Sequence, residues 1–130
     1  MLFRSQRAKQ IPSNIKSIAL VIPAIDIQEI HDGQLVEEIG LVDATNGPNV
    51  AYGAARPPDA DNPADSPASF SGIPMKIWYG SDDPVCTASS ILAFKNAVGA
   101  NCQLQNMGAV GHAYAGQYDD DILEFFHEHS

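Results

Sequence analysis

Basic residues are scarce in this chain: 7 Lys and Arg stand against 16 Asp and Glu, for a formal net charge of -9. Nucleic acids and anionic membranes are bound by clustered Lys and Arg, so this balance argues against both as partners. No apolar run approaches the roughly 20 residues that a membrane span requires. Residues 1–7 are not followed by an apolar stretch, so we expect no signal peptide.

Cysteine is also rare, with Cys86 and Cys102 as the only two. They stand at opposite ends of one predicted helix of about 14 residues, which at about 1.5 Å per residue is roughly 20 Å long. A disulfide cannot bridge that distance, so we expect free thiols and a reducing compartment.

The 130 residues, of which 45% are hydrophobic, are enough for one domain with its own core. The continuous apolar run Ile18–Ile22, ended by Pro23, is typical of a strand that is covered on both faces of a parallel sheet. Met75–Tyr79 and Cys102–Asn106 are the second and third predicted strands. The sequence therefore predicts an α/β fold with about three parallel strands and flanking helices.

Helices are expected around these strands. Residues 2–10 form one, Asp26–Glu29 is a capping box, and a short helical piece contains Leu35, Val36 and Ile39. A helix opening at Cys86 or Thr87 buries one face and ends at Gly99. The last helix opens at Asp119. The helix that ends at Gly99 is expected to bury Ile91, Phe94 and Val98. The last helix is expected to bury Ile122, Phe125 and Phe126, and Tyr118 could pack on Leu123 as a hydrophobic staple.

Residues 43–72 differ in composition, because five prolines fall there among many Ala, Asp and Ser residues. We expect a long excursion with at most a short helix near Ser66–Phe70. Excursions of this length in compact domains are typical of binding loops, lids or disordered segments.

Two side chains with acid–base chemistry follow two of the predicted strands. Asp83 comes just after Met75–Tyr79, and His112 comes just after Cys102–Asn106. Functional groups of open parallel sheets collect at the carboxyl ends of strands. A carboxylate there can orient an imidazole and leave its other nitrogen free to take a proton. Taken singly, Asp82 and Asp83 also fit a turn, and His112 also fits an exposed surface histidine.

The residues around this pair resemble the last third of α/β-hydrolase-fold serine hydrolases. In that family one strand ends in Gly-x-x-Asp-x-Val and carries the triad acid, and the next strand's loop ends in Gly-His and carries the base. The matching positions are Gly80, Asp83, Val85, Gly111 and His112. The resemblance implies a partial α/β-hydrolase fold over residues 1–130, with Asp83 as catalytic acid, His112 as catalytic base, and 43–72 in the place of a lid. It implies no cofactor and no metal.

The family's nucleophile motif, Gly-x-Ser-x-Gly, does not occur in this sequence. By resemblance, the chain begins just downstream of that motif, and Ile18–Ile22 lacks the strand that would pair with its other edge. Unpaired edges invite pairing with another chain. We therefore expect a complementary chain, an upstream segment, a homo-oligomer or a larger assembly as partner, and a small acyl substrate if the protein is active.

Two functions from different classes follow. In one, the chain is the acid/base half of a serine hydrolase that is inactive alone. In the other, it is a non-catalytic structural or interaction protein. Residues 23–32 are similar to hydrolase-like proteins encoded by phages, some in tail gene clusters. This resemblance makes a virion-associated location an alternative to a cytoplasmic one.

Four further residues or groups are weaker candidates. Cys86 lies near a predicted helix N-terminus, which can lower the pKa of a thiol. His127 and His129 complement the end of the last helix, with metal binding as the lesser alternative. Trp78 is expected to pack in its strand, and Asp26 is expected to cap a helix.

Overall fold

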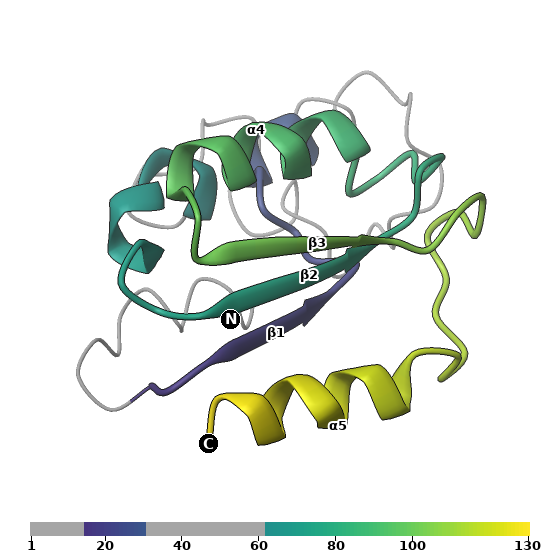
Figure 1. Ribbon diagram of the computed structural model, residues 1–130. Coiled ribbons are helices and arrows are strands. Elements are labelled where there is room, and N and C mark those ends of the chain that lie inside the picture. Colours follow the sequence, from purple (N-terminus) through teal and green to yellow (C-terminus); the bar gives the residue numbers. More distant parts are fainter. Residues whose placement is uncertain (1–14, 31–61) are drawn as a thin grey trace.

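The computed structural model describes residues 15–30 and 62–130. They form a three-stranded parallel sheet in the order β1-β2-β3 (Figure 1). The strands are β1 (Ile18–Val21), β2 (Met75–Tyr79) and β3 (Cys102–Asn106). The predicted α/β class and the parallel sheet are confirmed, and only the end of the first strand moves. Ile22 leaves the strand because its backbone adopts a φ of 40°.

Helices cover both faces of the sheet. Helix α4 (Ala88–Val98) lies on one face together with the 3-10 turn η3 (Pro67–Phe70), and α5 (Asp119–Glu128) lies on the other (Figure 1). Successive β2 residues alternate between the two layers: Ile77 packs in the cluster with α4, and Trp78 packs in the cluster with α5. Both are fully buried. Two-sided cover explains why the residues of this strand other than Lys76 are apolar or aromatic.

Helix α4 has the start and the buried face that its sequence predicts. Thr87 is its N-cap and accepts a hydrogen bond from the Ser90 N–H at 3.3 Å. Gly99 ends it with a φ of 102°, a conformation that favours glycine. The three buried residues are the predicted Ile91, Phe94 and Val98.

Helix α5 buries a narrower stripe than predicted. Phe125 is 3% exposed and packs edge-on against Trp78, with ring centroids 6.1 Å apart. Phe126 is 42% exposed and Leu123 is 58% exposed, so the predicted burial of Phe126 and the staple onto Leu123 are wrong. At about 100° per residue, Phe126 and Leu123 point roughly 100° and 160° away from Phe125. Only one side of α5 faces the sheet, and neither residue is on it.

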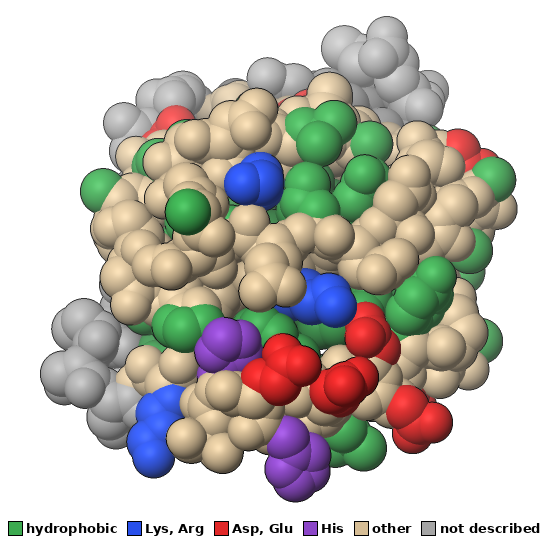
Figure 2. All heavy atoms as spheres, viewed as in Figure 1, with side chains coloured by type: hydrophobic (Ala, Val, Ile, Leu, Met, Phe, Trp, Pro, Cys, Tyr) green, Lys and Arg blue, Asp and Glu red, His purple; other side chains and the backbone are tan. Residues whose placement is uncertain are grey.

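A polar clamp holds α5 to β2. Asp121 Oδ2 accepts one hydrogen bond from Trp78 Nε1 at 2.8 Å and another from Lys76 Nζ at 3.0 Å. Figure 2 shows acidic side chains gathered over α5 with a basic side chain beside them. The hydrogen bond from Lys76, followed by that from Trp78, lowers the pKa of Asp121. The buried indole N–H is thereby satisfied, as burial in this layer requires.

The chain after residue 61 is held by hydrogen bonds to the segment that follows β1. Asn62 is buried, and its Oδ1 accepts the Ile27 N–H at 2.8 Å while its amide donates to Asp26 and Asp65, each at 3.1 Å. Asp26 also accepts the Glu29 N–H at 3.2 Å, so its predicted role as a helix cap is confirmed. The Glu29 carboxylate does not complete the capping box. It accepts a hydrogen bond from Thr87 Oγ1 at 3.0 Å instead.

Several predictions lie outside the described residues: the helix at 2–10, the helical piece at 35–39, and positions 43–61 of the excursion. The short helix expected near Ser66–Phe70 is present as η3, preceded by a second 3-10 turn, η2 (Pro63–Asp65). Within the described ranges, β1 pairs only with β2, and no helix has the length and apolar character to cross a bilayer.

The clamp predicts a pH-dependent stability for Asp121→Asn. Because the pKa of Asp121 is lowered on folding, its stabilisation is present above the unfolded-state pKa and is lost as pH falls through the folded-state pKa. Its side chain is 35% exposed, so we expect a loss on the order of 1 kcal/mol or less at neutral pH, shrinking in acid. Urea unfolding at several pH values measures it.

The matched control is Asp120→Asn, which removes the same charge from the same helical turn without touching Lys76 or Trp78. It should leave stability and its pH dependence close to those of the parent chain. Equal losses for the two variants would mean that helix-end charge, rather than the clamp, accounts for the effect.

Candidate active site

Two loops meet at the carboxyl ends of β2 and β3. One follows β2 from Gly80 to Cys86, and the other follows β3 from Met107 to His112. Backbone hydrogen bonds join them, from Met107 N to Tyr79 O at 2.8 Å and from Ser81 N to Gly108 O at 2.9 Å. Side chains on the two loops are therefore held in a fixed relation by the sheet.

Asp83 lies at the centre of this junction with its carboxylate fully removed from solvent. Its Oδ1 accepts the backbone N–H groups of Val85 at 2.8 Å and Cys86 at 2.9 Å. These two donors supply the hydrogen bonds that a buried carboxylate needs and fix the direction of the second oxygen.

That second oxygen faces His112. Asp83 Oδ2 lies 3.0 Å from His112 Nδ1, and the imidazole side chain is 33% exposed. An ionised carboxylate can only accept a hydrogen bond, so the neutral ring carries its proton on Nδ1 and keeps a lone pair on Nε2. The structure thus brings together the two residues predicted from the sequence, in the arrangement that lets an imidazole act as a base. Their catalytic roles remain predictions.

Asp82 has a different place from Asp83. Its Oδ1 accepts the backbone N–H of Gly111 at 2.8 Å, one residue before His112. Gly111 adopts a φ of 63°, which favours glycine, so the loop turns sharply there. Asp82 therefore holds the histidine loop, while Asp83 holds the ring.

Gly80 allows the two loops to approach. A Cβ built on Gly80 would lie 2.6 Å from the carbonyl oxygen of Gly111 and 3.2 Å from Cγ2 of Val110. The distance to the Gly111 oxygen is shorter than the contacts that Cβ atoms make in proteins. That oxygen belongs to the backbone, so it cannot move aside without shifting the loop. Glycine is required here by close packing, a reason that the sequence motif alone does not reveal.

Cys86 is not the mildly reactive thiol that its position suggested. It is 4% exposed, and burial, followed by the charges of Asp83 and Glu29, raises its pKa to about 12. The expectation of a lowered pKa is wrong because Thr87 is the N-cap, so the thiol lies outside the helix, between carboxylates. Both cysteines are free, as predicted.

Sequence reasoning missed that Cys86 joins the pair. One potential ligand atom from each of Asp83, Cys86 and His112 lies within 4.8 Å of the others. The three-residue interval between Asp83 and Cys86 was a signal for this, since the Asp83 carboxylate binds the backbone of Cys86 itself. The proximity to His112 depends on the pairing of β2 with β3 and could not be read from spacing.

The remaining candidates lie elsewhere. Trp78 packs toward α5, as expected for a strand residue. His127 is exposed near the end of α5, and the ring of His129 packs against Phe125 with centroids 4.6 Å apart. Searches of family models, curated proteins and solved structures found no significant match to this chain.

Gly80→Ala should separate the two loops. The overpacked Cβ predicts a loss of about 1–3 kcal/mol in the free energy of unfolding, measured by urea denaturation. Gly72→Ala is the matched control, because a Cβ there meets nothing within 4 Å. A Gly80→Ala chain as stable as Gly72→Ala would show that the loops do not pack this closely.

Proposed function

We propose that this chain supplies the acid–base pair of an α/β-hydrolase-like serine hydrolase acting on an ester or a related acyl bond. One observation carries the proposal: the 3.0 Å contact between His112 Nδ1 and a fully buried Asp83 carboxylate, in the loops that follow two neighbouring parallel strands. Burial of an anchored carboxylate against a partly exposed imidazole is the arrangement that acyl transfer uses.

The chemistry would run through Nε2 of His112. As a serine hydroxyl attacks the acyl carbon, Nε2 takes its proton, and Asp83 stabilises the imidazolium through the Nδ1 hydrogen bond. The imidazolium then gives that proton to the leaving oxygen, which releases the alcohol and leaves an acyl-serine. In the second half-reaction His112 takes a proton from water as the water oxygen adds to the acyl carbon. The imidazolium then gives that proton to the serine oxygen, which releases the acid and restores the free serine.

The serine and the oxyanion donors would come from a complementary chain or segment. The sequence holds no Gly-x-Ser-x-Gly, and within the described residues His112 hydrogen-bonds no hydroxyl or thiol. Strand β1 has a free edge among those residues, and adding a strand there would extend the parallel sheet. We propose this edge as the place where the complementary part docks.

The second candidate function is a non-catalytic scaffold, including a structural component of a virion. The lack of a hydroxyl partner for His112 in the described part of the chain favours it. In that role the Asp83–His112 pair would only fasten one loop to the other.

The test is esterase activity of the assembled species. The chain is co-expressed with the polypeptide encoded beside it, and hydrolysis of a chromogenic short-chain ester is followed. We expect no activity from the 130-residue chain alone, because its sequence holds no Gly-x-Ser-x-Gly and no described hydroxyl or thiol hydrogen-bonds His112. In the assembly, His112→Ala should lower the rate by about 10²–10⁴-fold, the usual contribution of a general base.

His127→Ala is the matched control, since it removes an exposed histidine from α5, and its rate should stay at the parent level. Asp83→Asn should resemble His112→Ala, because an amide can hold the ring in the wrong tautomer. Ester hydrolysis that survives His112→Ala would contradict the proposed roles. An assembly without activity would favour the scaffold.

A further inference from the structure

A thiol, an imidazole and a carboxylate converge at the loop junction. Asp83 and Cys86 are buried, His112 is on the solvent side, and one ligand atom from each lies within 4.8 Å of the other two. Two loops from different strands supply them, so the cluster is a product of the fold rather than of local sequence. These three groups are all common ligands of transition metals.

Their spacing is close to that of a tetrahedral site. Zn²⁺ binds oxygen, nitrogen and sulfur at about 2.0–2.3 Å, so two of its ligand atoms lie roughly 3.3–3.8 Å apart. Asp83 Oδ2 and His112 Nδ1 are 3.0 Å apart, and the three ligand atoms all lie within 4.8 Å of one another. Small side-chain movements, open to His112 because its ring is partly exposed, would bring all three ligands to one ion.

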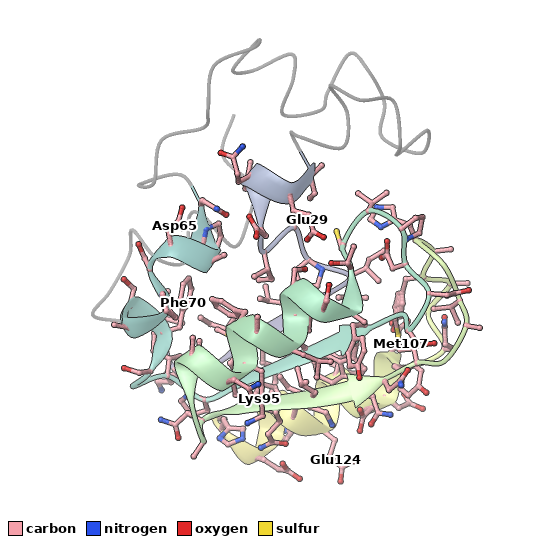
Figure 3. All side chains as sticks on the ribbon, turned by 90° about the horizontal axis from the view of Figure 1, so that it is seen from above. Glu29, Asp65, Phe70, Lys95, Met107 and Glu124 are labelled. Carbon is pink, nitrogen blue, oxygen red and sulfur yellow. The ribbon has the colours of Figure 1, made fainter. Side chains whose placement is uncertain are left out.

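The surroundings favour a cation. Asp83 and Glu29 both place negative charge near the Cys86 sulfur, and Glu29 points from the helical residues 27–30 toward the start of α4 (Figure 3). Among the described residues no Lys or Arg pairs with either carboxylate. A bound divalent ion would reverse the effect of this field on the thiol, since a coordinated cysteine is deprotonated.

We propose that Asp83, Cys86 and His112 form a site for Zn²⁺ or a chemically similar ion. Thiolate and imidazole ligands select this class over Mg²⁺ and Ca²⁺, which prefer sets of oxygen ligands. Three protein ligands leave a fourth position for water. Binding releases the Cys86 proton to solvent and forms the sulfur–metal bond. The proton on His112 Nδ1 is lost to solvent while Nε2 takes one up, so that the Nδ1 lone pair binds the ion.

The site does not depend on the hydrolase role. Coordination through the ring would engage His112 and displace its hydrogen bond to Asp83, so metal binding and general-base catalysis exclude one another. Zn²⁺ would thus inhibit a working dyad, whereas a scaffold protein could hold the ion permanently. Metal binding is measured by titration and needs no assay of ester hydrolysis. A failure of the metal-site proposal can therefore be told apart from a failure of the hydrolase proposal.

The test is titration of the reduced 130-residue chain with Co²⁺, which reports thiolate coordination by a charge-transfer band in the near ultraviolet. We expect one equivalent to bind, with the band abolished by added Zn²⁺. Cys86→Ala should remove the band, and His112→Ala should weaken binding by at least about tenfold, the lower end of what loss of a merely supporting partner costs a metal site.

Cys102→Ala and His127→Ala are the controls, because each removes the same type of side chain from outside the cluster. Both should keep the band and the affinity, and circular dichroism checks that every variant is folded. A folded parent chain without a thiolate band overturns the proposal. So does a band that persists in Cys86→Ala, or an affinity that His112→Ala leaves unchanged.

Discussion

The loop junction depends on one buried carboxylate, that of Asp83. Two backbone N–H groups, from Val85 and Cys86, hold one of its oxygens, and the other is left to face His112. A buried carboxylate without hydrogen-bond donors would cost the fold several kcal/mol, roughly, in lost hydration. The turn supplies these donors, and the carboxylate in turn satisfies two backbone N–H groups of the turn. The geometry of the histidine, and of any ion that replaces its hydrogen bond, follows from that turn.

The sheet brings the two halves of the junction together. Strands β2 and β3 pair in parallel from Met75↔Cys102 to Tyr79↔Asn106, so their loops leave the same edge side by side. Gly80 then permits backbone contact between the loops. Strand β2 is buried on both faces, and this burial fixes its register with β3. The packing of α4 and α5 against the sheet therefore also fixes where the polar loops leave the strand ends.

Much of this could be predicted from the sequence, because the strands and α4 follow strong local rules of apolar runs, caps and glycine ends. The pairing of Asp83 with His112 was predictable once both were placed at strand ends. The exposure of Phe126 and the raised pKa of Cys86 were not. The first depends on how α5 is rotated on the sheet. The second depends mainly on the burial of the thiol, then on the charge of Asp83, and last on that of Glu29, which is 57 positions away in the chain.

The central claim is that Asp83 holds the ring of His112 in one tautomer, and nitrogen NMR of the metal-free chain tests it most directly. The structure predicts that the neutral ring of His112 carries its proton on Nδ1, exchanging slowly, with Nε2 unprotonated. In Asp83→Asn this preference should be lost. A neutral ring protonated mainly on Nε2, as in free histidine, or signals that Asp83→Asn leaves unchanged, would contradict the claim.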